Sequence, residues 1–290
     1  MTHRLKVVIA FTVLCSAMLV AFVKVGVSGA PILNGQKYIV VVIPSYNNKE
    51  WYKLNLGTLF LQKYDNYHVV YIDDCSNDGT ADLVEQYIAN CGQQRRVTLI
   101  KNKERKGALY NLYHAIRSCD DHAIVLTYDG DDWFKDYQVL ATVNKAYDDP
   151  NVWLTYGQFE VHPGGALGQC RPMPEYIIKS HSYRQQPWIT SHLRTFYAGL
   201  FNQIKEEDLL FEGKFFEVTW DQAFLFPMLE MANGHIKFID KVLYVYNQQN
   251  PLNDFKVRLG KQLYCERLIR RKTCYKPLDE QQARRSFVVV

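Results

Sequence analysis

The chain has 290 residues, of which 48% are hydrophobic and 14% aromatic. This composition can bury a sizeable core, so it excludes a disordered protein and favours one large domain or two closely fused halves. The 34 basic and 30 acidic residues give a net charge of +4, which is too balanced to predict a nucleic-acid partner.

The N-terminal segment, residues 1–35, predicts membrane targeting. Residues 7–23 are apolar except for two hydroxyl side chains, and basic residues precede them. This length lies near the lower limit of about 17–25 residues for a spanning helix, and it exceeds the roughly 7–15 residues of a signal-peptide core. We therefore favour a transmembrane anchor over a signal peptide cut near Ala30. A single-pass membrane protein is expected, facing the Golgi or ER lumen in a eukaryote or lying in the inner membrane of a bacterium.

Short apolar strands alternate with helical segments from residue 36 to residue 132. In chain order, the pattern predicts the strand 38–44, the helix 49–62, the strand 68–72, the helix 81–89, the strand 96–101, the helix 108–118 and the strand 123–128. The β-branched run of the first strand is typical of a strand covered on both faces. This rhythm predicts an α/β fold with a doubly wound, mostly parallel sheet, which binds ligands at the carboxyl ends of its strands.

The pattern changes in the second half, residues 133–250. We predict a strand over 152–161, a flexible loop over 162–168, a helical segment over 187–204, a helix over 222–232 and a strand over 236–247. The basic C-terminal tail, residues 251–290, carries an amphipathic helical pattern. A solvated helix and a contact with an anionic membrane face both remain open for this tail.

Carboxylates gather where two predicted strands end. Asp73 and Asp74 end the second strand, and Asp129, Asp131 and Asp132 follow the fourth. Three carboxylates within four residues after a buried strand place like charges side by side, which is unfavourable unless a cation compensates. Hard oxygen ligands suit Mn²⁺ or Mg²⁺. The acidic turn therefore predicts a metal or diphosphate site.

Other polar residues at the predicted strand ends suit a nucleotide. A carboxylate at Asp73 or Asp74 can accept the N3 hydrogen of uracil, which cytosine lacks. Ser45 and Tyr46 end the first strand, where backbone and hydroxyl groups can hold a base or ribose.

A basic pair before the third helix is the candidate for a phosphate contact. Arg105 and Lys106 precede a glycine and a helix, so a cationic side chain can reach a phosphate there. A solvated run of charges is an equally good interpretation.

Four motifs together resemble the family-2 glycosyltransferases of the glycosyltransferase-A fold. They are Ile43-Pro44-Ser45-Tyr46-Asn47, Ile72-Asp73-Asp74-Cys75-Ser76-Asn77-Asp78-Gly79-Thr80, Lys106-Gly107 with Asn111, and Asp129-Gly130-Asp131-Asp132. The resemblance covers about residues 37–250, and it is specific because the motifs stand in order at strand ends. It implies a nucleotide-sugar-binding half, 36–132, and an acceptor-binding half, 133–250, in one domain.

The resemblance also implies roles within the donor site. It assigns the cation to Asp131 and Asp132 and leaves Asp129 nearer the ribose. Pro44 and Gly130 belong to the same donor site. Such a cation stabilises charge on the departing diphosphate.

A base must deprotonate the acceptor hydroxyl. The resemblance implies an acidic residue at the start of a helix in the second half, which Trp220-Asp221-Gln222 resembles. Asp221 is the predicted catalytic base, with Glu217 in reserve, although the sequence departs from the commoner Glu-Asp pair of this motif. A helix N-cap is a competing and compatible role for Asp221. Trp220 either stacks on a sugar or packs in the core.

Three histidines and one polar segment complete the candidates. His181, His192 and His235 are weak candidates for extra metal ligands, since a lone histidine is more often structural. Residues 184–194 are dense in sugar-contacting types, and we place them on the acceptor wall, with a core helix as the default alternative.

We therefore predict a metal-dependent, inverting glycosyltransferase. It would move a sugar from a nucleotide sugar, expected to be UDP-linked, to a hydroxyl of a glycan, protein or lipid acceptor. A nucleotidyltransferase is one alternative, but it should carry a glycine-rich basic loop after the first strand, and residues 45–48 do not provide one. A non-catalytic carbohydrate-binding relative is the other, and it would not release a nucleoside diphosphate.

Overall fold

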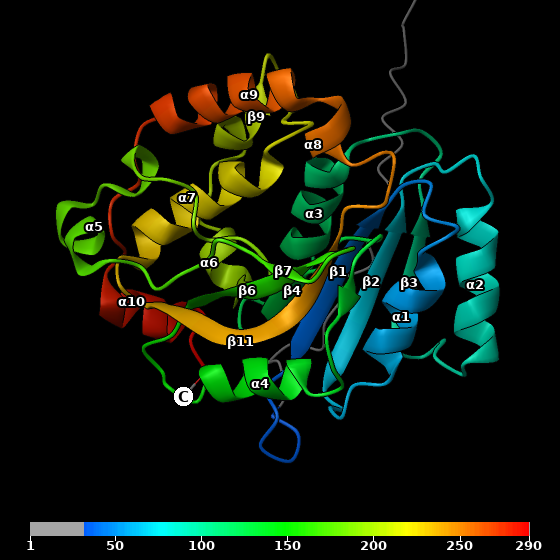
Figure 1. Ribbon diagram of the computed structural model, residues 1–290. Helices are drawn as coiled ribbons and strands as arrows, with labels where there is room; N and C mark the ends of the chain where they lie inside the picture. The colour runs from blue at the N-terminus through cyan, green and yellow to red at the C-terminus, as the bar shows by residue number, and fades with distance from the viewer. Residues whose placement is uncertain (1–31, 290) are drawn as a thin grey trace, which may run out of the picture.

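The computed structural model describes residues 32–289, in which strands and helices alternate (Figure 1). The strands are β1 (Ile39–Ser45), β2 (Tyr67–Asp73), β3 (Val97–Lys101), β4 (Ile124–Thr127), β5 (Trp133–Phe134), β6 (Leu154–His162), β7 (Ala166–Leu167), β8 (Arg194–Tyr197), β9 (Leu210–Phe211), β10 (Lys214–Phe215) and β11 (Ile236–Asn247). The α-helices are α1 (Tyr52–Phe60), α2 (Thr80–Asn90), α3 (Ala108–Arg117), α4 (Val139–Ala146), α5 (Glu175–Ser180), α6 (Ala198–Phe201), α7 (Trp220–Ala232), α8 (Asp254–Val257), α9 (Leu259–Arg271) and α10 (Glu280–Ser286). Two short 3₁₀ helices are η1 (Tyr183–Gln185) and η2 (Glu206–Leu209).

One curved sheet runs through the described part of the chain. Its strand order is β3-β2-β1-β4-β8-β6-β11-β5, with β7 paired to β6. The pairs β1–β2, β2–β3, β1–β4 and β6–β11 are parallel, while β8 runs antiparallel to both β4 and β6. The predicted α/β fold with a doubly wound, mostly parallel sheet is therefore confirmed.

The strand order reverses at β1, which has β2 on one side and β4 on the other. Every residue of β1 is buried, because helices cover both faces of this part of the sheet. Figure 1 shows α1 and α2 on one face and α3 on the other. In such sheets the crevice at the reversal point, outside the carboxyl ends of the strands, is where ligands bind.

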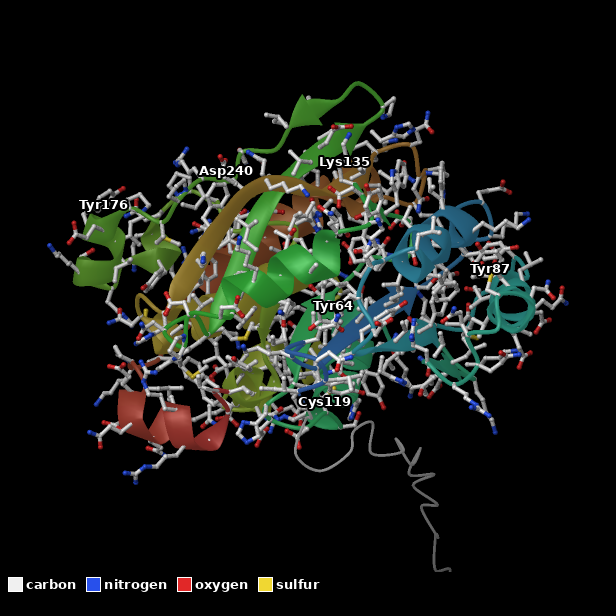
Figure 2. All side chains as sticks on the ribbon, turned by 90° about the horizontal axis from the view of Figure 1, so that it is seen from below. Tyr64, Tyr87, Cys119, Lys135, Tyr176 and Asp240 are labelled. Carbon is white, nitrogen blue, oxygen red and sulfur yellow. The ribbon has the colours of Figure 1, made fainter. Side chains whose placement is uncertain are left out.

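The opposite end of the sheet is held by structural contacts. The Tyr64 hydroxyl donates to the carbonyl of Lys37, just before β1, and lies 3.0 Å from the amide oxygen of Asn144 in α4. Figure 2 views the molecule from this end, with Tyr64 labelled. These contacts tie the start of β1 to α4 and leave the carboxyl ends of the strands for function.

The predicted helical segment over 187–204 is wrong. This stretch contains β8, which lies between β4 and β6, followed only by the four-residue α6. The sequence Arg-Thr-Phe-Tyr of β8 has β-branched and aromatic residues that suit a strand, and pairing on both sides fixes that state. Of the loop predicted over 162–168, residues 163–165 form the turn between β6 and β7, whereas 166–167 are β7 itself.

The described residues contradict the expected single-pass membrane localisation. No helix within residues 32–289 is long and apolar enough to cross a membrane. The two longest, α7 and α9, have 13 residues each, fewer than the roughly 17–25 that a spanning helix needs. The apolar run of residues 7–23, on which the expectation rested, lies outside the described residues.

Candidate active site

Two strand ends meet at the reversal point of the sheet. Gly130, in the turn after β4, packs so closely on the end of β1 that an added Cβ would lie 2.8 Å from Asn48 Nδ2 and 2.9 Å from the Cβ and Oγ of Ser45. The Ser45 hydroxyl is fixed in turn by the hydroxyl of Tyr71 at 2.7 Å. Glycine at position 130 therefore lets the acidic turn lie directly against β1.

A cavity of about 310 Å³ opens beside this contact. Its walls include six of the predicted donor residues, namely Pro44, Ser45, Tyr46, Asp74, Arg105 and Lys106. The second half contributes Glu217 and Trp220 to the cavity wall, and the tail contributes Arg258. The fold thus brings predicted donor residues and acceptor-side residues to one cavity.

The two carboxylates after β2 have different surroundings. Asp74 lines the cavity and accepts the backbone N–H groups of Lys106 (2.9 Å) and Gly107 (2.8 Å) and the amide of Asn102 (2.8 Å). Asp73 accepts the N–H of Ser76 at 3.0 Å with one oxygen. Its other oxygen is buried without a hydrogen-bond partner among the described residues. Asp74 therefore shapes the loop before α3 from inside the cavity.

An aromatic and cationic platform lies on the same wall. The guanidinium carbon of Arg105 stands 3.8 Å from the centre of the Tyr46 ring. Lys106 is exposed and paired with Glu104. A flat base can stack on such a platform, and a cation next to a helix start suits a phosphate.

The acidic turn is held by residues in the last, turn-facing part of β11 and just after it, Tyr244, Asn247 and Asn250. Asp132 is buried and accepts the Tyr244 hydroxyl at 2.6 Å and the Asn247 backbone N–H at 2.7 Å. Asp131 accepts the side-chain amide of Asn250 at 2.8 Å. Burial raises the pKa of Asp132 well above its ordinary range, and the charges of Asp131 and Asp129 raise it further. The turn is therefore electrostatically crowded, as predicted from the sequence.

A cation fits one part of this turn. Asp129, Asp132 and His192 each offer a ligand atom, and these atoms lie within 4.8 Å of one another. Burial, followed by the charge of Arg194, lowers the pKa of His192 well below its ordinary value, so its ring is neutral and able to bind a metal. Asp131 lies outside this group. The structure thus gathers one of the two predicted metal ligands, Asp132, with Asp129 and His192.

The other two histidines have structural partners. The ring nitrogens of His181 contact Asn233 Oδ1 and the carbonyl of Tyr275. His235 stacks on Trp153 at 3.8 Å between ring centres and contacts the carbonyl of Asn151.

The predicted base lies in the first turn of α7. One carboxylate oxygen of Asp221 accepts the backbone N–H of Gln222 at 2.9 Å, and the other accepts Arg194 Nη1 at 2.9 Å. The N-cap of α7 is Thr219, so Asp221 does not occupy the N-cap position. Its side chain is 25% exposed, which leaves it open to a substrate.

The reserve candidate, Glu217, lines the cavity itself and is paired with cations. Lys261 lies 2.6 Å away and Arg258 lies 3.7 Å away. The hydrogen bond from Lys261 lowers the pKa of Glu217. A carboxylate with a lowered pKa accepts a proton less readily, which weakens Glu217 as a candidate base.

Residues 184–194, expected on the acceptor wall, divide between two environments. Arg184 is buried in an ion pair with Glu230 at 2.5 Å. His192 and Arg194 reach the site, and Arg194 lies 5.5 Å from the ring centre of Trp220.

Three site residues form no motif in the sequence and are not predicted from it. They are Tyr244, Asn247 and Asn250, which hydrogen-bond to the acidic turn.

Comparisons with known proteins agree with this geometry. A model of the family described as Glycosyl transferase family 2 matches residues 40–207. Two proteins of Bacillus subtilis (strain 168) are similar over 103 residues each: TuaG, named as a glycosyltransferase of teichuronic acid biosynthesis, is 25% identical, and EpsE, named as a glycosyltransferase, is 30% identical. These stretches cover 36% and 34% of this chain. They span only 40% and 35% of those relatives.

Solved structures share the fold. Residues 1–349 of S. aureus TarS match with a TM-score of 0.58 at 18% identity, covering 85% of this chain and 68% of TarS 1–349. The mannosyltransferase PcManGT from Pyrobaculum calidifontis, in complex with GDP-Man and Mn²⁺, matches with a TM-score of 0.55 at 20% identity, covering 82% and 65%. Because the family model spans more than half of the chain and the four strand-end motifs meet at one site, the chain belongs to glycosyl transferase family 2.

Proposed function

We propose that this chain is a metal-dependent, inverting glycosyltransferase that transfers a sugar from a UDP-sugar to the hydroxyl of a glycan, protein or lipid acceptor. The observation that carries the proposal is the shared cavity. Tyr46, Asp74 and Arg105 line it from the first half, and Trp220, the residue before Asp221 in the chain, lines it from the second half. A donor and an acceptor can therefore meet between the two sets of residues.

Donor recognition is assigned to the first half. Tyr46 and Arg105 offer a stacking surface for the base, and Asp74 lies beside them as an acceptor for a ring N–H. Another structure of S. aureus TarS is a complex with UDP-GlcNAc, with a TM-score of 0.54, which supports a UDP-sugar. A guanine ring also presents N–H groups to a carboxylate, so GDP-sugars belong in the test.

A divalent cation, Mn²⁺ or Mg²⁺, suits the acidic turn. Asp129, Asp132 and His192 would hold it, with Asp131 as the further predicted ligand. A mixed oxygen and imidazole set favours Mn²⁺ over Mg²⁺. When bound, the cation would neutralise charge on the departing diphosphate.

The chemical step is assigned to Asp221. Its carboxylate takes the proton of the acceptor hydroxyl while that oxygen forms a bond to the anomeric carbon. The bond from the anomeric carbon to the diphosphate oxygen breaks on the opposite side, and the electron pair leaves with the diphosphate. Attack opposite to the leaving group inverts the anomeric configuration. Arg105, Lys106 and Arg258 on the cavity wall can stabilise the released diphosphate.

The test is a panel of UDP-glucose, UDP-N-acetylglucosamine and GDP-mannose incubated with Mn²⁺, with water and simple sugars as acceptors. We expect release of a nucleoside diphosphate from one donor, stimulated by Mn²⁺, and a product of inverted configuration by NMR. Binding of a sugar without release of a nucleoside diphosphate would identify a carbohydrate-binding relative instead. Formation of a nucleotide sugar from a nucleoside triphosphate and a sugar phosphate would identify a nucleotidyltransferase.

A further inference from the structure

Arg194 is a buried cation that faces two carboxylates of the site. Its side chain is 1% exposed, and its Nη1 donates to Asp221 Oδ2 at 2.9 Å. Its Nη2 lies 3.9 Å from Asp129 Oδ2 and 3.1 Å from His192 Nδ1. One guanidinium therefore stands between the acidic turn and the predicted base.

The sheet topology explains this placement. Arg194 begins β8 and pairs in register with Thr127, the last residue of β4. Because β8 runs antiparallel to β4, its first residue lies at the same edge of the sheet as the acidic turn. The strand that sequence patterns did not predict is thus the element that delivers Arg194 to the site.

The surroundings of this ion pair differ from those of a purely structural one. In the pair Arg184–Glu230, the two side chains are 2% and 0% exposed. In the ion pairs of Arg194 the cation is buried but the carboxylates are not, because Asp129 is 21% and Asp221 is 25% exposed. Arg194 therefore contacts both carboxylates from the buried side, and each carboxylate keeps a solvent-exposed side.

We propose that Arg194 is a positioning residue for the transfer step, which fixes the carboxylate of Asp221 toward the acceptor and ties it to Asp129 of the acidic turn. The planar guanidinium directs several N–H groups at once, whereas a lysine ammonium is a single point charge on a flexible chain. Arg194 therefore sets the orientation of the base relative to the donor turn. The inference rests on the proposed function.

The experiment measures nucleoside diphosphate release by the full chain from the three donors named above, with Mn²⁺, for wild type and four single variants. Arg194→Lys keeps the buried charge but replaces the planar guanidinium by a single ammonium group, and Arg194→Gln removes the charge. Asp221→Asn removes the base. Arg184→Gln is the matched control, since it breaks a buried arginine pair whose partner, Glu230, lies on the same helix, α7.

Arg194→Lys should lower kcat about 10- to 100-fold, as expected for a misplaced catalytic group, while the donor KM stays within about threefold. Arg184→Gln should lower the melting temperature and leave kcat, measured below that temperature, nearly unchanged. In the double variant Arg194→Gln/Asp221→Asn, kcat should equal that of Asp221→Asn, because an orienting residue has no effect once the base is gone.

A wild-type kcat for Arg194→Lys would overturn the inference, as would losses that multiply in the double variant. If Arg194→Gln does not fold, Arg194→Lys decides the question through its kcat and KM, with its melting temperature as the control. Failure of the proposed function gives a different result, because the wild type itself would then release no nucleoside diphosphate.

Discussion

Asp74 accepts the backbone N–H of Gly107 at 2.8 Å, which joins the end of β2 to the start of α3. The same carboxylate accepts the N–H of Lys106 with its other oxygen. A side chain predicted to recognise the nucleotide base therefore also fixes the loop that carries Arg105 and Lys106. Under the proposed function, base recognition and phosphate contact would therefore both depend on this carboxylate.

Asp74→Asn should weaken both functions. The amide presents an NH₂ group to a backbone N–H, and the loss of a charge-assisted hydrogen bond is worth about 1.5–3 kcal/mol. We expect at least a tenfold loss of UDP affinity by calorimetry, in line with about 1.4 kcal/mol per tenfold. The control is Asp78→Ala, which removes the acceptor for the N–H and hydroxyl of Thr80 at the start of α2. It should lower stability by about 1 kcal/mol and leave UDP affinity unchanged.

Asp221→Asn should reduce donor turnover about 10²- to 10⁴-fold, the usual contribution of a general base. The donor KM should change little, because Asp221 is not part of the nucleotide wall. Glu217→Gln is the comparison variant, since Glu217 lines the cavity but is paired with Lys261. A larger loss of kcat for Glu217→Gln than for Asp221→Asn would reverse the assignment of the base.

Gly130→Ala should destabilise the fold. The new methyl group would lie 2.8–2.9 Å from Asn48 and Ser45, and overpacking of this kind costs about 1–3 kcal/mol. Gly260→Ala, in α9, is the matched control because no atom outside its chain neighbours and the backbone of its own helix lies within 4 Å of the added carbon, and it should stabilise by about 0.5–1 kcal/mol. Urea unfolding measures the free energy of unfolding of both variants. An equal change for the two would mean that position 130 has room for a side chain.

Removal of divalent cations with EDTA should abolish nucleoside diphosphate release, and added Mn²⁺ should restore it. His192→Ala should weaken Mn²⁺ binding at least about tenfold, as followed by electron paramagnetic resonance of the free ion. His235→Ala, which loses a stack on Trp153 instead, should bind Mn²⁺ like the wild type. If Asp131→Ala lost Mn²⁺ while His192→Ala kept it, the cation would belong nearer Asp131 than the cluster around His192 indicates.

Lys261→Met should lower stability at neutral pH but not in acid. The hydrogen bond from Lys261 lowers the pKa of Glu217 below 4.5 in the folded protein, so its contribution is present above pH 4.5 and is lost as the pH falls through the folded pKa. Glu217 is 53% exposed, so we expect less than about 1 kcal/mol. Urea unfolding at pH 7 and pH 3 measures the difference. In a Glu217→Gln background the substitution should show no such pH dependence.

The strands that build the donor side could be predicted because their signals are local. The β-branched run of β1 and the acidic residues after β2 and β4 stand in consecutive positions, and the predicted strand 236–247 has the bounds of β11. In contrast, β8 has four residues, too few for a clear period. Its strand conformation depends on pairing with β4 and β6, which are distant in sequence.

The same distinction separates the site residues. Asp74 and Asp129 belong to motifs, so their place at a strand end was predictable. Tyr244, Asn247 and Asn250 act on carboxylates that lie 112 to 119 positions earlier in the chain. No local sequence pattern predicts such a contact, because it depends on how distant strands pair in the folded sheet.

The closure of the acidic turn by the residues at and after the end of β11 constrains how this protein can be recombined. A chimera that joined residues 36–132 to the second half of a distant relative would retain Asp131 and Asp132 but would lose the hydrogen bonds from the Tyr244 hydroxyl and the Asn250 side-chain amide. The crowded carboxylates would then lack these polar contacts. Residues 36–132 are therefore not sufficient by themselves to form the acidic turn as it stands here, because the residues that contact it lie in and after β11.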